Sequence, residues 1–218
     1  MTRIHAPQLD RMRITFNSID FDCPQLAKFI NRTPTLRALD TAHVKFDDHS
    51  SNVVLLGRPP EIRISCVSGL WHNFDRDWCV SFVVQVCNSL PTPSPVKDLH
   101  IEYECEHTQL WTNDAIGNTP WLQLLLPFTA VKNLCLSEEV ALGIAVALQE
   151  LVGARITEVL PSLQNIFVGE LGSEPLETFQ ENIGKFVAAR RLSGHPVAVL
   201  VGKEPVQNDG EEGEESAL

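Results

Sequence analysis

Apolar residues recur along this chain in a six-position pattern, apolar-x-x-apolar-x-apolar. Copies occur at Leu9/Met12/Ile14, Val96/Leu99/Ile101, Val131/Leu134/Leu136 and Leu163/Ile166/Val168, with a degenerate copy at Val197/Val199/Val201. From Leu99 onward, the middle positions of successive copies are separated by 35, 32 and 33 residues. A near-constant period of this length is typical of stacked repeats. The alternating part of each copy predicts a short strand with one buried face.

Apolar stripes between these strands predict helices with one buried side. The stripes are Cys79, Val83, Val86, Cys87 and Leu90; then Val140, Ile144, Leu148 and Leu151; and last Leu176, Phe179, Ile183, Phe186 and Val187. Ser137 is placed to cap the second of these helices, whose first turn carries two glutamates. Gly153 is placed to end it, and Gly194 follows the last one.

The first half of the chain is less regular. A helix is expected over residues 23–39, between strands at 12–16 and 43–46. Residues 53–56 read as extended, and too few residues separate them from the next strand, at 62–66, for a helix to intervene. We therefore expect a β-hairpin insertion here.

Alternating strands and helices of this kind predict an α/β solenoid. Each unit alone leaves one face of its strand and one stripe of its helix in water, and stacking buries both. The predicted architecture is a curved, mostly parallel sheet lining the inside of an arc, with helices outside. Residues 1–203 form this domain, and residues 204–218 form an acidic tail that is expected to be disordered because it has almost nothing to bury.

Composition narrows the possible partners. The 218 residues carry a formal net charge of −11, and six acidic residues but no Lys or Arg lie in 204–218. This balance argues against a nucleic-acid partner. No apolar run is long enough for a transmembrane helix, and no secretory signal is seen at the start, so we expect no membrane partner and a cytoplasmic or nuclear location.

Candidate chemistry is sparse. The six cysteines form no C-x-x-C pair. His72 with Asp75 and Asp77, and the run of residues 47–49, are loop groups that lack a second ligand set at a defined spacing, so we expect no metal and no cofactor. No nucleophile or phosphate-binding motif is present. We expect no enzyme activity; a cysteine-dependent hydrolase is the less favoured alternative. The tryptophans at 71, 78, 111 and 121 are read as packing residues in preference to partner anchors.

Several longer stretches of the sequence resemble a known protein family. The clearest of them are FDCPQLAKFINRTPTLRALD, EIRISC, WLQLLLPFTAVKNLCLS, ALQELVGARITEVLPSLQNIFV and FVAARRLSGHPVAV. Over about residues 8–202 the chain resembles the leucine-rich-repeat, C-terminal region of fungal F-box proteins. The resemblance implies the substrate-recognition half of a ubiquitin-ligase receptor. An F-box would precede the repeats, and here the first repeat strand begins by residues 9–12, so we expect binding to the ligase adaptor only if an F-box is supplied upstream. The alternative is a stand-alone repeat scaffold or an orphan fragment.

Side chains that alternate with the buried strand positions point away from the core. In chain order these are Arg13, Lys45, Arg63, His100, Cys135, Phe167 and Ala198 or Leu200. They predict a ladder across the concave face that is basic at its start and apolar at its end. We expect a protein or peptide partner there, with an acidic end over Arg13 and Arg63 and an apolar anchor over Phe167.

Overall fold

The computed structural model describes residues 9–16, 23–33, 36, 39–47, 50–57, 60–67, 76–90, 95–104, 118–151 and 153–202. The strands are β1 (Arg11–Phe16), β2 (Leu39–Asp47), β3 (Ser50–Gly57), β4 (Glu61–Val67), β5 (Asp98–Glu104), β6 (Asn133–Leu136), β7 (Asn165–Val168) and β8 (Ala198–Val201). The helices are α1 (Cys23–Asn31), α2 (Arg76–Ser89), α3 (Asn118–Leu125), α4 (Glu138–Gln149), the 3-10 helix η2 (Gly153–Thr157) and α5 (Ser173–Leu192). Within this part of the chain, no helix combines the length and apolarity that crossing a membrane requires.

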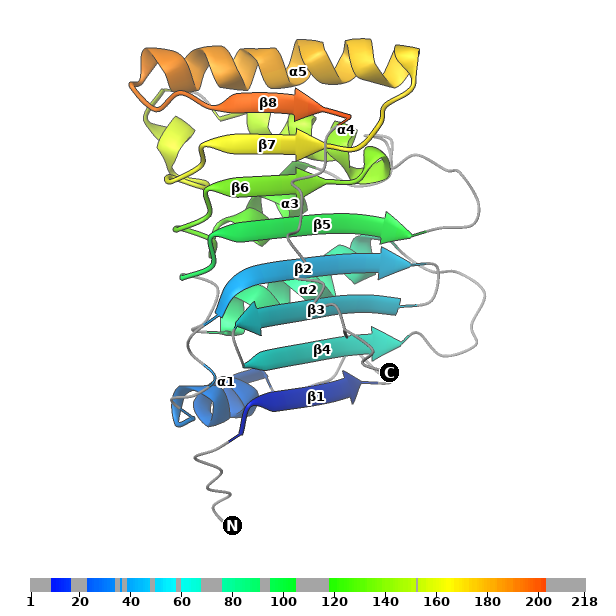
Figure 1. Cartoon of the computed structure of the whole chain (residues 1–218), viewed down its shortest axis with the longest axis vertical. Helices are drawn as coiled ribbons and strands as arrows, with labels where there is room; N and C mark the ends of the chain where they lie inside the picture. Colours follow the sequence, from blue (N-terminus) through cyan, green and yellow to red (C-terminus); the bar gives the residue numbers. More distant parts are fainter. Residues whose placement is uncertain are drawn as a thin grey trace, which may run out of the picture.

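The eight strands form one mixed sheet in the order β1-β4-β3-β2-β5-β6-β7-β8. β3 runs antiparallel to both of its neighbours, and every other pair is parallel. The labelled helices lie behind the sheet or along its β8 end, and none crosses in front (Figure 1). The protein is therefore a two-layer α/β structure with a mostly parallel sheet.

The repeat period predicted from the sequence is confirmed by the strand register. Leu99 pairs with Leu134, Leu134 with Ile166, and Ile166 with Val199. Leu99, Leu134 and Ile166 are fully buried. The recurring apolar motif thus places equivalent residues side by side in four neighbouring strands.

The hairpin predicted in the first half is also confirmed, but its effect on strand order was not foreseen. Reading the strands in chain order would set β2 beside β1. Instead β4 pairs with β1, and the β2–β3–β4 meander turns back so that β2 borders β5. Ile14, predicted to be buried, is only half-buried, because β1 is the edge strand and has a neighbour on one side alone.

Two helix boundaries and one capping contact differ from the prediction. α1 ends at Asn31, well short of residue 39, and Leu39 already belongs to β2. Ser137 is the N-cap residue of α4 but makes no side-chain cap hydrogen bond; its hydroxyl accepts the backbone N–H of Tyr103 at 3.1 Å instead. Gly153, with φ of +57°, opens η2 and does not end α4.

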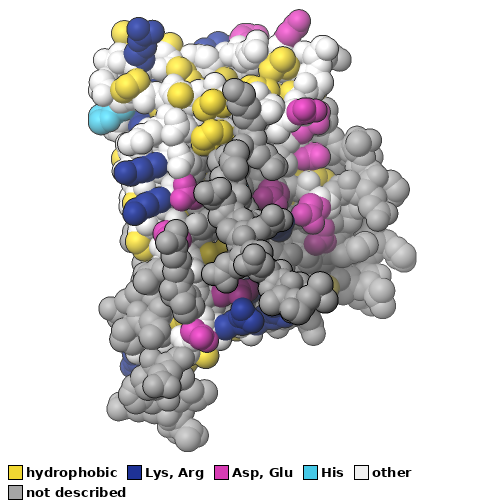
Figure 2. Space-filling view, viewed as in Figure 1, with side chains coloured by type: hydrophobic (Ala, Val, Ile, Leu, Met, Phe, Trp, Pro, Cys, Tyr) yellow, Lys and Arg dark blue, Asp and Glu magenta, His cyan; other side chains and the backbone are white. Residues whose placement is uncertain are grey.

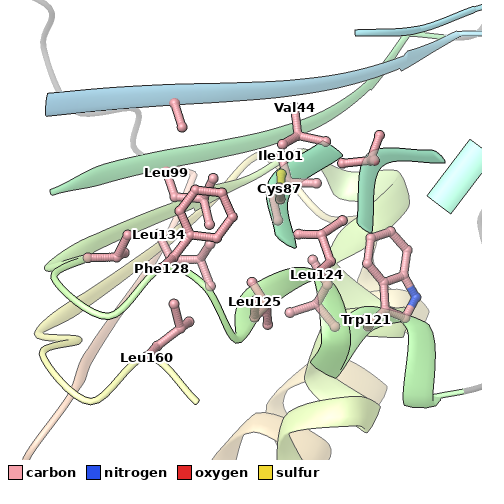
Figure 3. Packing of buried hydrophobic residues seen from close by; sticks show 14 of the residues in the cluster. Val44, Cys87, Leu99, Ile101, Trp121, Leu124, Leu125, Phe128, Leu134 and Leu160 are labelled. Carbon is pink, nitrogen blue, oxygen red and sulfur yellow. The ribbon is translucent and has the colours of Figure 1, made fainter. Parts of the chain in front are cut away.

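One apolar core lies between the sheet and the helices. Leu99, Leu134, Phe128, Leu125 and other labelled side chains converge there from strands, helices and connecting loops (Figure 3). Every residue of the stripe predicted for the helix at 78–90 is buried. This packing explains why the two cysteines of that helix, at 79 and 87, behave as small apolar residues.

Trp121 of α3 is the largest fully buried side chain among the described residues. Its ring meets Phe46 of β2 edge-on, with 6.2 Å between ring centroids. A Cβ atom added to Gly143 of α4 would stand 3.0 Å from Trp121 Nε1. Gly143 therefore lets α4 approach α3 closely.

Arg190 of α5 is buried, although Arg residues rarely are. Its guanidinium donates to the backbone carbonyls of Ile156, Pro161 and Leu163 at 3.2–3.3 Å. Burial lowers its pKa. The side chain fastens α5 to η2 and to the segment that joins η2 to β7.

Candidate functional site on the front face of the sheet

The front face of the sheet is the face opposite the helices, turned toward the viewer in Figure 1. Strand alternation separates the two faces cleanly: β5 reads half-buried, buried, half-buried, buried from Asp98 onward, and β6 and β7 repeat this. Val54 of β3 also faces front, because its neighbours Val53 and Leu55 belong to the core cluster and it does not.

Eight register partners form one continuous row across the front face. In order they are Arg13, Arg63, Val54, His43, His100, Cys135, Phe167 and Leu200. Six of the seven residues that the sequence singled out lie in this front-face row. Phe167 is half-buried and alternates with the buried Ile166 and Val168, so the side-chain register of β7 is the one expected.

Lys45 is the exception. It lies one side-chain pair beyond the row, opposite Glu102, and the row passes through His43 in its place. The reason is the hairpin, because it fixes the register between β2 and β5. That register does not follow from the apolar pattern of β2 alone. The hairpin also contributes Val54, a row member that sequence reasoning missed.

The row changes character from one end to the other. Hydrophobic side chains gather on the part of this face around β7 and β8, whereas Lys or Arg and acidic side chains lie together toward β1 (Figure 2). At the basic end, Glu61 lies between two arginines, 3.0 Å from Arg11 Nε and 3.4 Å from Arg63 Nε. The same corner holds a depression of about 470 Å³ lined in part by Arg11, Leu56 and Glu61.

A polar cluster occupies the middle of the face, on β2 and β5. The rings of His43 and His100 stack with centroids 4.3 Å apart and planes 13° from parallel. His43 Nδ1 lies 3.8 Å from Glu102 Oε1, and Lys45 Nζ lies 2.7 Å from Glu102 Oε2 and 3.0 Å from Glu104 Oε1. We call His43, Lys45, His100 and Glu102 the histidine–glutamate cluster.

Electrostatics set the protonation of this cluster. His43 and Lys45 hold the pKa of the Glu102 carboxyl down at about 2, and Lys45 makes the direct hydrogen bond. Burial, with the neighbouring His43, lowers the pKa of His100. The glutamates beside Lys45, Glu102 foremost, raise its pKa. At neutral pH the cluster therefore presents an ionised carboxylate beside an uncharged His100 ring.

Amide side chains connect the next strands. Asn133 Nδ2 donates to Asp98 Oδ1 at 2.6 Å, and Asn165 Nδ2 donates to Asn133 Oδ1 at 2.8 Å. These three residues are register partners on β5, β6 and β7. These hydrogen bonds connect the first residues of β5, β6 and β7 on the front face, and they recur with the period of the apolar motif.

The buried cysteines contribute to core packing, and their thiols are not exposed to solvent. Cys66, Cys79 and Cys87 are fully buried, and burial raises the pKa of Cys87 to about 12. Cys135 is half-buried on the front face, where it is the register partner of His100.

Some sequence expectations fall outside the described residues. Among them are the side chains of residues 71, 72, 75, 77, 78 and 111 and the residues at 48 and 49, together with the tail from 203 onward. Trp121, the remaining tryptophan, is a packing residue.

Comparisons with protein-family models, with curated proteins and with solved structures found no match for this chain.

Proposed function

We propose that this chain is a non-enzymatic protein-interaction module, a leucine-rich-repeat-like solenoid whose sheet binds a protein or peptide partner. The observation that carries the proposal is the front-face row, a continuous line of register partners on a face that none of the described helices covers. Repeats that stack with a period near 33 residues build extended surfaces of this kind. The part that the chain would play is substrate recognition in an F-box type ubiquitin-ligase receptor.

The gradient along the row defines the partner. Arg13 is exposed and Arg63 half-buried at one end, and Phe167 and Leu200 are partly accessible at the other. Aromatic and arginine side chains contribute most of the binding energy at protein interfaces. The partner is therefore a segment with an acidic end, lying over Arg13 and Arg63, and an apolar anchor that packs on Phe167.

A displayed peptide library tests this surface by selecting binders from random sequences. Peptides selected on the intact protein are resynthesised, and their affinities are compared for the wild type and for a Phe167→Ala, Arg63→Glu double variant. We expect the double variant to bind at least about tenfold more weakly. The matched control is Leu192→Ala with Arg155→Glu, which removes an apolar side chain that is 90% exposed and an exposed arginine, both away from the strands.

Equal loss in the control, or no loss in the front-face variant, contradicts the proposed surface. The ligase part is tested separately by calorimetric titration with the purified adaptor. We expect binding only for a chain that carries an F-box before its repeats, and sub-micromolar binding by the present chain contradicts that expectation. A stand-alone scaffold would bind the peptides and never the adaptor.

A cysteine-dependent hydrolase is the second candidate, because Cys135 and His100 are neighbours on β6 and β5. A nucleophilic thiol activated by an imidazole reacts as the thiolate well below the ordinary cysteine pKa of about 8.5. Alkylation of Cys135 followed by mass spectrometry between pH 5 and pH 9 separates the two. A rate that reaches a plateau below pH 7, and that His100→Ala abolishes, favours the hydrolase; the absence of such a plateau favours the interaction module.

A further inference from the structure

Three side chains in the middle of the front face bring metal-binding atoms together. Each of His43, His100 and Glu102 offers one ligand atom, and these atoms all lie within 4.8 Å of one another. The histidines are 57 residues apart in sequence and meet because β2 and β5 pair in register. Glu102 joins them because side chains two residues apart on a strand share a face.

We propose that His43, His100 and Glu102 form a binding site for a divalent metal ion of the zinc class. Two imidazoles and one carboxylate are a donor set that zinc takes in proteins, with the fourth tetrahedral position left to water. The site does not depend on the proposed function, since it would bind its ion whether or not a partner covers the face.

Binding an ion requires the ligand atoms to move closer together, but it does not require the backbone to refold. Bonds of about 2.0–2.2 Å place tetrahedral ligand atoms roughly 3.3 Å apart. The ligand atoms now lie within 4.8 Å of one another, so binding an ion requires the two stacked rings to rotate about their side-chain torsions. The rings already lie on adjacent strands with centroids 4.3 Å apart, so the backbone can stay in place.

Neighbouring groups prepare the carboxylate. Lys45 holds Glu102 Oε2 at 2.7 Å, which leaves Oε1 on the side of His43. A second contact, from Lys45 Nζ to Glu104 Oε1 at 3.0 Å, holds the ammonium group between the two glutamates. An outer hydrogen bond that orients a ligating carboxylate is a regular feature of metal sites.

The cluster is open to solvent on the front face. His43 and Glu102 side chains are 16% and 30% exposed, so an ion can enter from solvent and still lose most of its water.

Calorimetric titration of untagged protein with zinc chloride, in a buffer that does not bind metals, tests the site. We expect one equivalent to bind per chain, and His100→Asn and Glu102→Gln each to weaken binding more than about tenfold. His195→Asn is the matched control, because His195 is an exposed histidine after α5, away from the cluster. It should leave the affinity unchanged, and an excess of magnesium should not compete.

Cobalt(II) supplies a second readout, since its visible absorption reports the coordination number. The wild type should give the intense bands of a four-coordinate ion, and Glu102→Gln should lose them. Far-UV circular dichroism checks that each variant is folded, and Glu102→Gln carries the test if His100→Asn is not. Zinc binding that persists in both ligand variants, that is lost equally in His195→Asn, or that is absent from the wild type overturns the proposal.

Discussion

Alanine at two helical glycines should change stability in opposite directions. Gly143 lies inside α4 with Trp121 against it, and Gly184 lies inside α5 with no atom within 4 Å of the position of a Cβ. Replacing glycine by alanine in a helix interior contributes about 1 kcal/mol of stability through backbone entropy alone. Both variants share that gain, so the difference between them isolates the contact with Trp121.

The size of that contact follows from the distance. A Cβ 3.0 Å from Trp121 Nε1 is well inside the usual separation of about 3.5–4.0 Å. Trp121 is fully buried and held edge-on by Phe46, so the ring has little space to withdraw. Overpacking of this kind costs about 1–3 kcal/mol. Gly143→Ala should therefore lose about 1 kcal/mol net, and Gly184→Ala should gain up to about 1 kcal/mol.

Urea denaturation followed by far-UV circular dichroism measures both free energies of unfolding. A Trp121→Leu background supplies the second control, because it removes the indole Nε1 that the new methyl group would meet. In that background the penalty of Gly143→Ala should fall toward zero, which a double-mutant cycle reports as coupling. The reasoning is refuted if Gly143→Ala is as stable as Gly184→Ala, or if Trp121→Leu leaves its penalty unchanged.

Three further predictions concern single side chains. Arg190→Met should lower the free energy of unfolding by about 2–4 kcal/mol, because two buried carbonyls lose a charged donor while relief of an unpaired buried charge offsets part of the loss; Arg191→Met, at an exposed neighbour, should change it by less than about 0.5 kcal/mol. The Glu102 carboxyl has a folded-state pKa of about 2 against an ordinary 4.5, so its stabilisation is complete above pH 4.5 and is lost as pH falls toward 2. Screening at this partly exposed site reduces it to about 1 kcal/mol, and acid unfolding of Glu102→Gln should lack that component. Native Cys87 should resist alkylation at pH 8 while Cys135 reacts, as mass spectrometry of the peptides will show; equal labelling contradicts the burial described.

The second half of the fold could be predicted from sequence because one spacing governs it. Once Leu99 is assigned to a buried strand position, steps of 35, 32 and 33 place the next three strands in register, whatever path the loops take. Helix α3 was the weak point of this half. Its buried residues, Trp121, Leu122, Leu124 and Leu125, lie on one side of the helix, but eight residues are too few for the helical period to be recognised.

The first half followed a different rule. A hairpin was recognisable from the short interval before 62–66, but local patterning does not say which edge of a meander joins the next strand. For this reason the histidine–glutamate cluster could not be predicted from the sequence. Each member follows the alternation of its own strand, and only the pairing of β2 with β5 brings His43 to His100. The loop groups that did look like metal ligands were chosen because they are close in sequence, which is a weaker criterion than a shared strand face.

The strand pairs of the sheet also differ in the length of chain that lies between the paired residues. Residue 11 pairs with residue 61 and residue 41 with residue 98, whereas residues 98, 133, 165 and 198 pair in successive short steps. Closing longer loops costs more entropy before any contact compensates for it. The short hairpins β2–β3 and β3–β4 and the repeat strands β5–β8 should therefore form before the two long closures, and β1 should join last. In hydrogen-exchange experiments the amides of β6 and β7 should form the slowest-exchanging group, and those of β1 should open on their own.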